Sequence, residues 1–286
     1  MIEPQVAMLP DGKRLHLQHG PIDLIIDAEG PDRVDALRAA ARRFDSVLEE
    51  LVEELPLLRE RVGFADLHGA TARRMCRATR PHGNADFITP MAAVAGAVAD
   101  EILTHMTTGH TLTRAYVNNG GDIALHLSPG ASFRLAIAGV DGTDNGRIVI
   151  RSDDPVRGIA TSGRGGRSLS MGIADSVTVL AQTAADADAA ATLIANAVML
   201  PDHPSINSAS AIEVDPNSDL GDRLVVTECG QLGKSDRAMA LNNGAERAER
   251  MLRDGLIVGA ALMLQGDTRT IGLPALIDHK KVMAHA

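Results

Sequence analysis

A segment in the second half of the sequence carries an aspartate and a threonine at a spacing that suits metal binding. Asp188 and Thr192 lie four residues apart in the alanine-rich segment 184–199, so both project from one face of the predicted helix. A carboxylate and a hydroxyl are hard oxygen ligands, which suit Mg²⁺ bound together with substrate phosphates. A structural interpretation stands beside this one, because an acidic residue early in a helix complements the helix dipole.

The start of this helix is marked by its neighbours in the sequence. Thr183 is placed to cap the helix, and Asp186 follows three residues later, as in a capping box. The segment 176–181, Ser-Val-Thr-Val-Leu-Ala, precedes it and is typical of a strand. The sequence therefore predicts a strand that runs into the helix of Asp188 and Thr192.

A glycine- and arginine-rich loop precedes that strand. It reads Ser162-Gly163-Arg164-Gly165-Gly166-Arg167-Ser168. Glycines permit close backbone approach, backbone amides can form a nest for an anion, and the two arginines add positive charge. The loop is equally well interpreted as a flexible surface turn.

A second turn, Asn118-Asn119-Gly120-Gly121-Asp122, lies between two predicted strands. Asn-Gly pairs favour the positive φ angles of tight hairpins, so turn chemistry explains most of this pattern. A functional role for Asp122 or Asn118 is the alternative.

The elements that must position these residues form two kinds of pattern. Apolar residues recur at helical spacing in 32–54, and further helices are predicted at 89–106, 184–199 and 235–253. Thr89 and Pro90 suit the cap and first position of the second helix. Strands are predicted on both sides of the Pro10-Asp11-Gly12 turn within 5–28, at five places between 112 and 181, at 224–228 and within 255–264. Because strands cluster more than they alternate with helices, we expect an α+β fold with a largely mixed sheet.

Composition excludes several classes of protein. The chain of 286 residues has a net charge of −9, one Tyr, four Phe and no Trp, which argues against a nucleic-acid binder. The longest apolar stretch is too short to span a membrane, and the N-terminus lacks a secretory signal, so we expect a cytoplasmic protein without membrane contact. The two cysteines, Cys76 and Cys229, are expected to be reduced thiols. By length we expect one domain over 1–286.

The order of these pieces resembles the ApbE-like superfamily, which has the fold of FAD:protein FMN transferases, and more closely its UPF0280 branch. Three blocks within residues 89–198 carry the resemblance: the helix PMAAVAGAVADEI with Gly96 and Asp100, the strand-turn VNNGGDIALHL, and the segment from ATSG to ADAAAT. The resemblance implies an ApbE-like, T-fold-related α+β fold, in which mixed or antiparallel sheets pack against helices.

The resemblance also implies a function and a set of site residues. Flavin transferases of this superfamily bind FAD and Mg²⁺ and move the FMN portion onto a Thr or Ser of a client protein. Carried over, Asp188, Thr192 and the carbonyl of Ala160 are expected to bind Mg²⁺, and Asp188, Thr192 and Asp122 are expected to be catalytic. The residues expected to bind the flavin or another anionic small molecule are Gly96, Asp100, Asn118, Gly120, Gly121, Thr161, Ser162, Gly163, Arg164, Arg167, Ser168 and Ser170.

The sequence departs from the transferase pattern at two places. Ala95 stands where transferases carry a Lys, and SLSMGIADSV replaces a His-x-x-Asp-Pro stretch. We therefore weigh three functions: an Mg²⁺-dependent enzyme acting on a flavin or another phosphate-bearing ligand, a different small-molecule enzyme with an Arg/Ser anion pocket, and a non-catalytic accessory protein of sulfur or cofactor metabolism. The first is favoured, and the oligomeric state stays open.

Overall fold

One long antiparallel sheet organises the chain. The computed structural model describes residues 3–63, 66–138, 144–166 and 168–272. Within these residues nine strands form a sheet in the order β1-β2-β3-β4-β5-β8-β9-β12-β13. Every neighbouring pair is antiparallel. The strands of the sheet are β1 (Gln5–Met8), β2 (Leu15–His19), β3 (Ile22–Glu29), β4 (Arg114–Asn119), β5 (Asp122–Leu127), β8 (Gly158–Ser162), β9 (Ser176–Ala181), β12 (Gly259–Leu264) and β13 (Asp267–Ile271).

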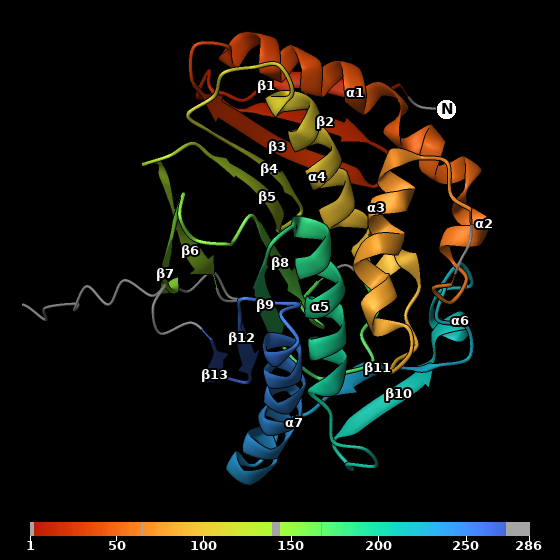
Figure 1. Cartoon of the computed structure of the whole chain (residues 1–286). Coiled ribbons are helices and arrows are strands. Elements are labelled where there is room, and N and C mark those ends of the chain that lie inside the picture. The colour runs from red at the N-terminus through yellow and green to blue at the C-terminus, as the bar shows by residue number, and fades with distance from the viewer. Residues whose placement is uncertain (1–2, 64–65, 139–143, 167, 273–286) are drawn as a thin grey trace, which may run out of the picture.

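Helices cover one face of this sheet (Figure 1). Alternating burial along β3 explains why, since Leu24 and Ile26 face the helices while Asp23 is exposed on the other side. The long helices are α1 (Arg33–Glu53), α3 (Ala70–Thr79), α4 (Val94–Thr107), α5 (Ala184–Ala197) and α7 (Lys234–Arg253). Short helical segments are α2 (Leu55–Leu58), η1 (Arg80–His82), η2 (Pro90–Ala93) and α6 (Ala211–Val214). The α+β prediction is confirmed, but the expectation of a largely mixed sheet is wrong, because every neighbouring pair of strands in the described sheet is antiparallel.

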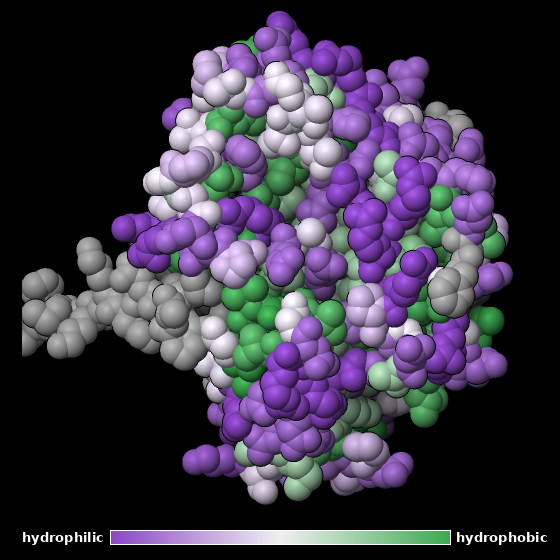
Figure 2. All heavy atoms as spheres, in the orientation of Figure 1, coloured by the Kyte–Doolittle hydropathy of each residue, from purple (hydrophilic) through white to green (hydrophobic). Residues whose placement is uncertain are grey.

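Two small two-stranded sheets complete the part of the fold that the structure describes. β6 (Ser132–Ala138) pairs with β7 (Asp144–Arg151), and this hairpin shares a small apolar core with the sheet face that the helices leave free. β10 (Ile206–Ser210) pairs with β11 (Leu224–Cys229) beside α6. Figure 2 shows that hydrophilic side chains cover most of the helix-bearing face, with hydrophobic atoms in smaller patches. Within the described residues, no helix is both long and apolar enough to cross a bilayer.

Three sequence expectations need correction. Residues 5–28 hold three strands instead of two, because Gly20, with φ of +56°, lets the chain turn back between β2 and β3. The helix expected at 89–106 begins as the 3-10 turn η2, and α4 starts only at Val94. Thr89 therefore does not cap that helix, and its hydroxyl donates to the Asp219 carboxylate instead.

Small residues fill the space between the helices. The buried face of α5 is mainly alanine, and Phe44 is the one aromatic residue among the largest fully buried side chains. Short side chains let helix axes approach closely, which is how a chain poor in aromatic residues still reaches native packing density. Cys76 and Cys229 are separate free thiols, as expected from the sequence.

Candidate functional site

The site is organised by the close crossing of α4 and α5. A Cβ added to Gly96 of α4 would lie 2.2 Å from the carbonyl oxygen of Ala184, at the start of α5. Gly158 of β8 is packed as tightly, since its Cβ would lie 2.0 Å from the Thr183 backbone. Glycine is therefore required on both sides, and the N-terminus of α5 is held between α4 and β8.

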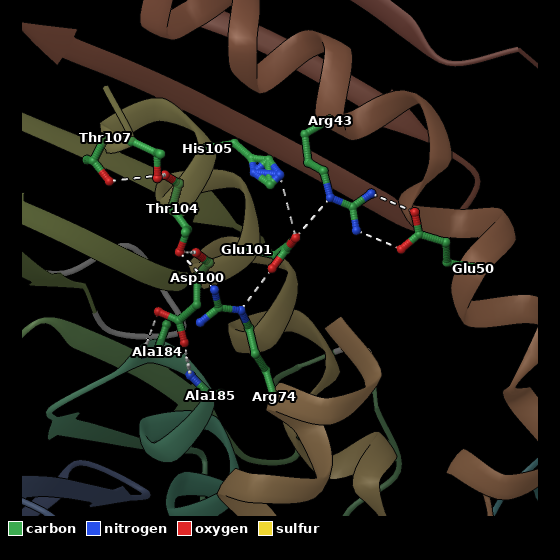
Figure 3. Close-up of polar contacts among 11 residues, drawn as sticks. Arg43, Glu50, Arg74, Asp100, Glu101, Thr104, His105, Thr107, Ala184 and Ala185 are labelled. Atoms are coloured by element: carbon green, nitrogen blue, oxygen red, sulfur yellow. Dashed lines mark hydrogen bonds and ion pairs between the residues drawn. The ribbon is translucent and has the colours of Figure 1, made fainter. Parts of the chain in front are cut away.

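The two helices cap each other at this crossing. Asp188 of α5 accepts a hydrogen bond from the backbone N–H of Gly96 at 3.0 Å, near the start of α4. Asp100 of α4 accepts from the backbone N–H groups of Ala184 at 3.1 Å and Ala185 at 2.9 Å, the first residues of α5 (Figure 3). Each carboxylate thus satisfies N–H groups that a helix start leaves without a partner.

A third carboxylate comes from the sheet. Gly120 and Gly121, with φ angles of +63° and +113°, form the tight turn between β4 and β5, and the Asn118 side chain accepts from the Gly121 N–H at 2.8 Å. Asp122 begins β5, and its Oδ1 accepts from the Thr161 N–H at 3.1 Å. Because the β5–β8 register covers only Ile123 and Ala124, this carboxylate takes the place of a ladder partner for Thr161.

These carboxylates repel one another. Burial raises the pKa of Asp188 well above its usual value, and the nearby Asp122 raises it further, while backbone N–H groups of Gly96 and Ala95 oppose the change. Burial also raises the pKa of Asp100 to about 6, against its two backbone hydrogen bonds. A proton or a cation placed between Asp122 and Asp188 relieves this repulsion.

The other expected metal ligands lie on α5 and on β8, the strand that neighbours β5. Thr192 is one helical turn beyond Asp188, is partly exposed, and has no hydrogen-bond partner among the described residues. Ala160 is buried in β8 directly before Thr161, whose N–H binds Asp122. Among the residues that the structure describes, no group of three or more His, Cys, Asp or Glu side chains could hold a metal. A metal here would depend on Asp122, Asp188 and neutral oxygen donors.

The glycine- and arginine-rich loop is arranged differently from the expected anion nest. The Arg164 guanidinium pairs with Asp175 at 2.9 Å, and its backbone N–H donates to the Ala174 carbonyl at 2.9 Å. The Ser170 hydroxyl is buried and donates to the Gly172 carbonyl at 3.1 Å. Arg164 and Ser170 are thus engaged within the fold.

The remaining loop residues are divided between the strand and the surface. Ser162 ends β8, Gly163 has φ of +140°, and Ser168 is exposed. Arg167 lies outside the described residues. Thr161 bonds across to the Thr178 hydroxyl at 2.9 Å.

One residue of this region was missed in the sequence. Asn119 is buried, and its side-chain N–H donates to the Ala95 carbonyl at 3.1 Å, tying the end of β4 to the start of α4. The alternation of the strand could have identified it, because Asn119 lies on the same buried face as Ala115 and Val117. An asparagine on such a face needs a partner.

Comparison with known proteins identifies relatives along nearly the whole chain. A family described as AbpE bacteria matches residues 6–270. A UPF0280 protein of Methanopyrus kandleri is 31% identical over 237 residues, which cover 80% of this chain and 94% of the relative. A UPF0280 protein of Methanothermobacter thermautotrophicus is 39% identical over 131 residues, covering 46% of this chain and 49% of that one.

A solved structure shares the fold. The flavin transferase ApbE from Vibrio cholerae superposes with a TM-score of 0.50 at 12% identity, covering 94% of this chain and 97% of that one. At this identity the likeness concerns the fold alone. The chain therefore belongs to the AbpE bacteria family and to the UPF0280 proteins, and it has an ApbE-like fold.

Proposed function

We propose that the protein binds Mg²⁺ and a phosphate-bearing small molecule, with FAD as the leading ligand, at the crossing of α4 and α5. The observation that carries this proposal is the convergence of Asp188 and Asp122 from a helix and a strand, with an electrostatic repulsion that raises the pKa of Asp188. A divalent cation would remove that repulsion.

The donor set fits Mg²⁺. This ion is held in proteins by one or two carboxylates together with substrate phosphates and water, rather than by a cage of several acidic side chains. Asp188 and Asp122 would supply the carboxylates, and the Thr192 hydroxyl and Ala160 carbonyl would supply neutral oxygens. When bound, Mg²⁺ would offset the negative charge of a pyrophosphate.

The residues of the protein would then orient this assembly. Asp100 holds the start of α5, and Asn119 holds the start of α4, so the two helices that frame the site are fixed by side chains from other elements. Preorganised donors and carboxylates lower the cost of binding a charged ligand.

The relatives suggest a reaction. The Vibrio cholerae structure is that of a flavin transferase, and we propose for this chain the corresponding transfer of FMN to a Thr or Ser of a client protein in the cytoplasm. Ala95 stands where the transferases carry Lys, so flavin binding is the first step to test. A small-molecule enzyme built around the Arg/Ser loop is less well supported, because Arg164 is paired with Asp175 and Ser170 is bound within its own loop.

The experiment is a calorimetric titration of FAD with and without Mg²⁺. We expect binding that requires Mg²⁺, and a loss of at least about tenfold in affinity in Asp188→Ala and Thr192→Val. Thr192→Val keeps the side-chain shape and removes only the hydroxyl. Glu249→Ala, an exposed acid on α7, serves as the charge-matched control and should bind as the wild type does. Equal binding with and without Mg²⁺, or unchanged binding in both site variants, would refute the proposal.

A further inference from the structure

A groove between α1 and α4 lies apart from the aspartate crossing. It has a volume of about 530 Å³ and is lined by Ala39, Arg42, Arg43, His105, Thr108 and His110. None of these six residues is acidic, although the chain as a whole carries a net charge of −9. The basic lining of this α1–α4 groove therefore stands out against the rest of the molecule.

The floor of the groove is a balanced ionic network (Figure 3). Glu101 is 3% exposed and accepts from Nε of Arg43 and Nε of Arg74, each at 2.9 Å. Arg43 also donates from both terminal nitrogens to Glu50, at 2.8 and 2.6 Å. Two guanidinium groups and two carboxylates thus neutralise one another and hold the floor rigid.

This balance leaves Arg42 as the uncompensated cation at the groove. Arg42 is exposed and has no ion-pair partner among the described residues. Arg38, one turn earlier on the same helix, is paired with Asp35 at 3.2 Å and does not line the groove. Among the arginines of α1, which all lie in described residues, Arg42 is thus the one without a carboxylate partner.

Two imidazoles supply further hydrogen-bonding groups. Burial lowers the pKa of His105, and Arg43 and Arg74 lower it further, whereas Glu101 at 3.9 Å raises it. His110 keeps its Nδ1 buried without a hydrogen-bond partner. A buried Nδ1 without a partner costs less free energy as an acceptor than as an N–H donor. The ring proton of His110 is therefore assigned to Nε2, which makes Nε2 a hydrogen-bond donor.

From these features we propose that the α1–α4 groove binds a small phosphate monoester through Arg42, His105 and His110, independently of Mg²⁺. A guanidinium with neighbouring imidazole donors matches a phosphate dianion, and the lining offers no acid to repel it. The groove also leaves room for an organic body beyond the phosphate group. Asp100 bonds to the start of α5 whereas Glu101 bonds to α1 and α3, so this site is separate from the aspartate crossing (Figure 3).

The test uses ribose 5-phosphate as the probe, titrated in the presence of EDTA so that no divalent cation contributes. Histidine Cε1–H signals are followed by NMR on the full chain. We expect the signals of His105 and His110 to shift and saturate, and Arg42→Gln to weaken binding at least about tenfold, the loss typical of one charge-assisted hydrogen bond.

Matched controls separate this site from the aspartate crossing. Arg38→Gln on the same helix and Asp188→Ala at the crossing should bind the probe as the wild type does, and ribose alone should not bind. Inorganic phosphate should shift the same signals if the phosphate group carries recognition. Unmoved His105 and His110 signals, equal binding by ribose, or wild-type affinity in Arg42→Gln would overturn the proposal, whatever the outcome for FAD.

Discussion

Asp100 and Glu101 are neighbours in the sequence, and their carboxylates lie in opposite electrostatic environments. Asp100 faces α5 and accepts from two backbone N–H groups, and burial raises its pKa to about 6, although these bonds and the nearby Arg74 lower it. Glu101 faces α1 and α3. Burial alone would raise the pKa of Glu101, but hydrogen bonds from Arg43 and Arg74 outweigh burial and lower it.

The two sides of α4 differ in whether the buried carboxylates are balanced by cationic side chains. On the Glu101 side, each carboxylate of the network has a guanidinium partner, so nothing further is needed for its stability. On the Asp100 side, the three carboxylates of Asp188, Asp122 and Asp100 lie near one another, and within the described residues the only positive charges that the hydrogen bonds bring to Asp188 are the partial charges of helix-start N–H groups. An excess of negative charge at a preorganised position is a reason to expect a cation there.

The largest expected effect on stability comes from removing Glu101 from its ion-pair network with Arg43 and Arg74. Glu101→Ala leaves the largely buried Arg43 with Glu50 alone and removes the carboxylate partner of the partly buried Arg74, and we expect it to lower the free energy of unfolding by about 3–5 kcal/mol. Urea denaturation measures the change. Glu53→Ala, on exposed α1 surface, is the control and should change stability by less than about 0.5 kcal/mol. If both variants lose less than about 0.5 kcal/mol of unfolding free energy, the ion-pair network does not stabilise the fold.

A smaller loss is expected where the two helices cross. Gly96→Ala places a Cβ about 2.2 Å from the Ala184 carbonyl oxygen, so α4 and α5 must separate, at a cost of about 3 kcal/mol. In Gly63→Ala the new Cβ has its nearest neighbour, the Arg61 carbonyl oxygen, at 3.8 Å, so that variant should be neutral or slightly stabilised. Thermal and urea unfolding of both variants test the contrast. If Gly96→Ala unfolds like the wild type, the tight crossing is incorrect.

The pH dependence of stability should also differ between the two sides. Asp100 has a folded-state pKa of about 6 against an ordinary value of 3.8, so the native state holds its proton more tightly. The resulting stabilisation is fully present below the unfolded-state value and is lost as the pH rises through about 6.

Comparison with Asp100→Asn isolates this contribution, because the amide does not titrate. The unfolding free energy of the wild type minus that of the variant should fall by about 2 kcal/mol as the pH rises from about 4 to about 7, after allowance for partial exposure of Asp100. Urea unfolding at a series of pH values measures the difference. A difference that is constant with pH would place Asp100 in an ordinary environment.

The smallest effect concerns the cap of α5 itself. The Thr183 hydroxyl accepts from the Asp186 N–H at 3.1 Å and donates to the Asp186 carboxylate at 2.7 Å. Thr183→Ala should cost about 1 kcal/mol, and Thr183→Ser should restore most of it. Thermal unfolding of the pair provides the measurement. Equal stability of the two variants would show that the hydroxyl does not contribute.

Local sequence signals predicted the part of the site that is close in the chain. The Thr183–Asp186 cap, the strand before it and the Gly120-Gly121 turn all depend on residues a few positions apart, and the structure has them where they were expected. Propensity and capping rules act at this range, so a single sequence contains the information.

Contacts between distant segments could not be predicted in this way. Asp188 and Gly96 are 92 positions apart, and Asp100 and Ala185 are 85 apart, so their mutual capping depends on tertiary packing. The residues carried over from the family do include both aspartates, but as expected ligand-binding residues rather than as helix caps. Arg43, Arg74 and Glu101 gave no signal, since isolated charges reveal a partner only once α1, α3 and α4 are assembled.

The most direct test of the difference between the α4–α5 crossing and the Glu101 network is a pair of pH titrations, with and without Mg²⁺. The carboxyl groups of Asp188 and Glu101 are followed by ¹³C NMR. Without metal, Asp188 should titrate well above its ordinary range, and saturating Mg²⁺ should move that titration to lower pH because the metal competes with the proton. Glu101 should titrate below its ordinary range in both conditions. An Asp188 titration that Mg²⁺ leaves unchanged would contradict a cation site at the α4–α5 crossing.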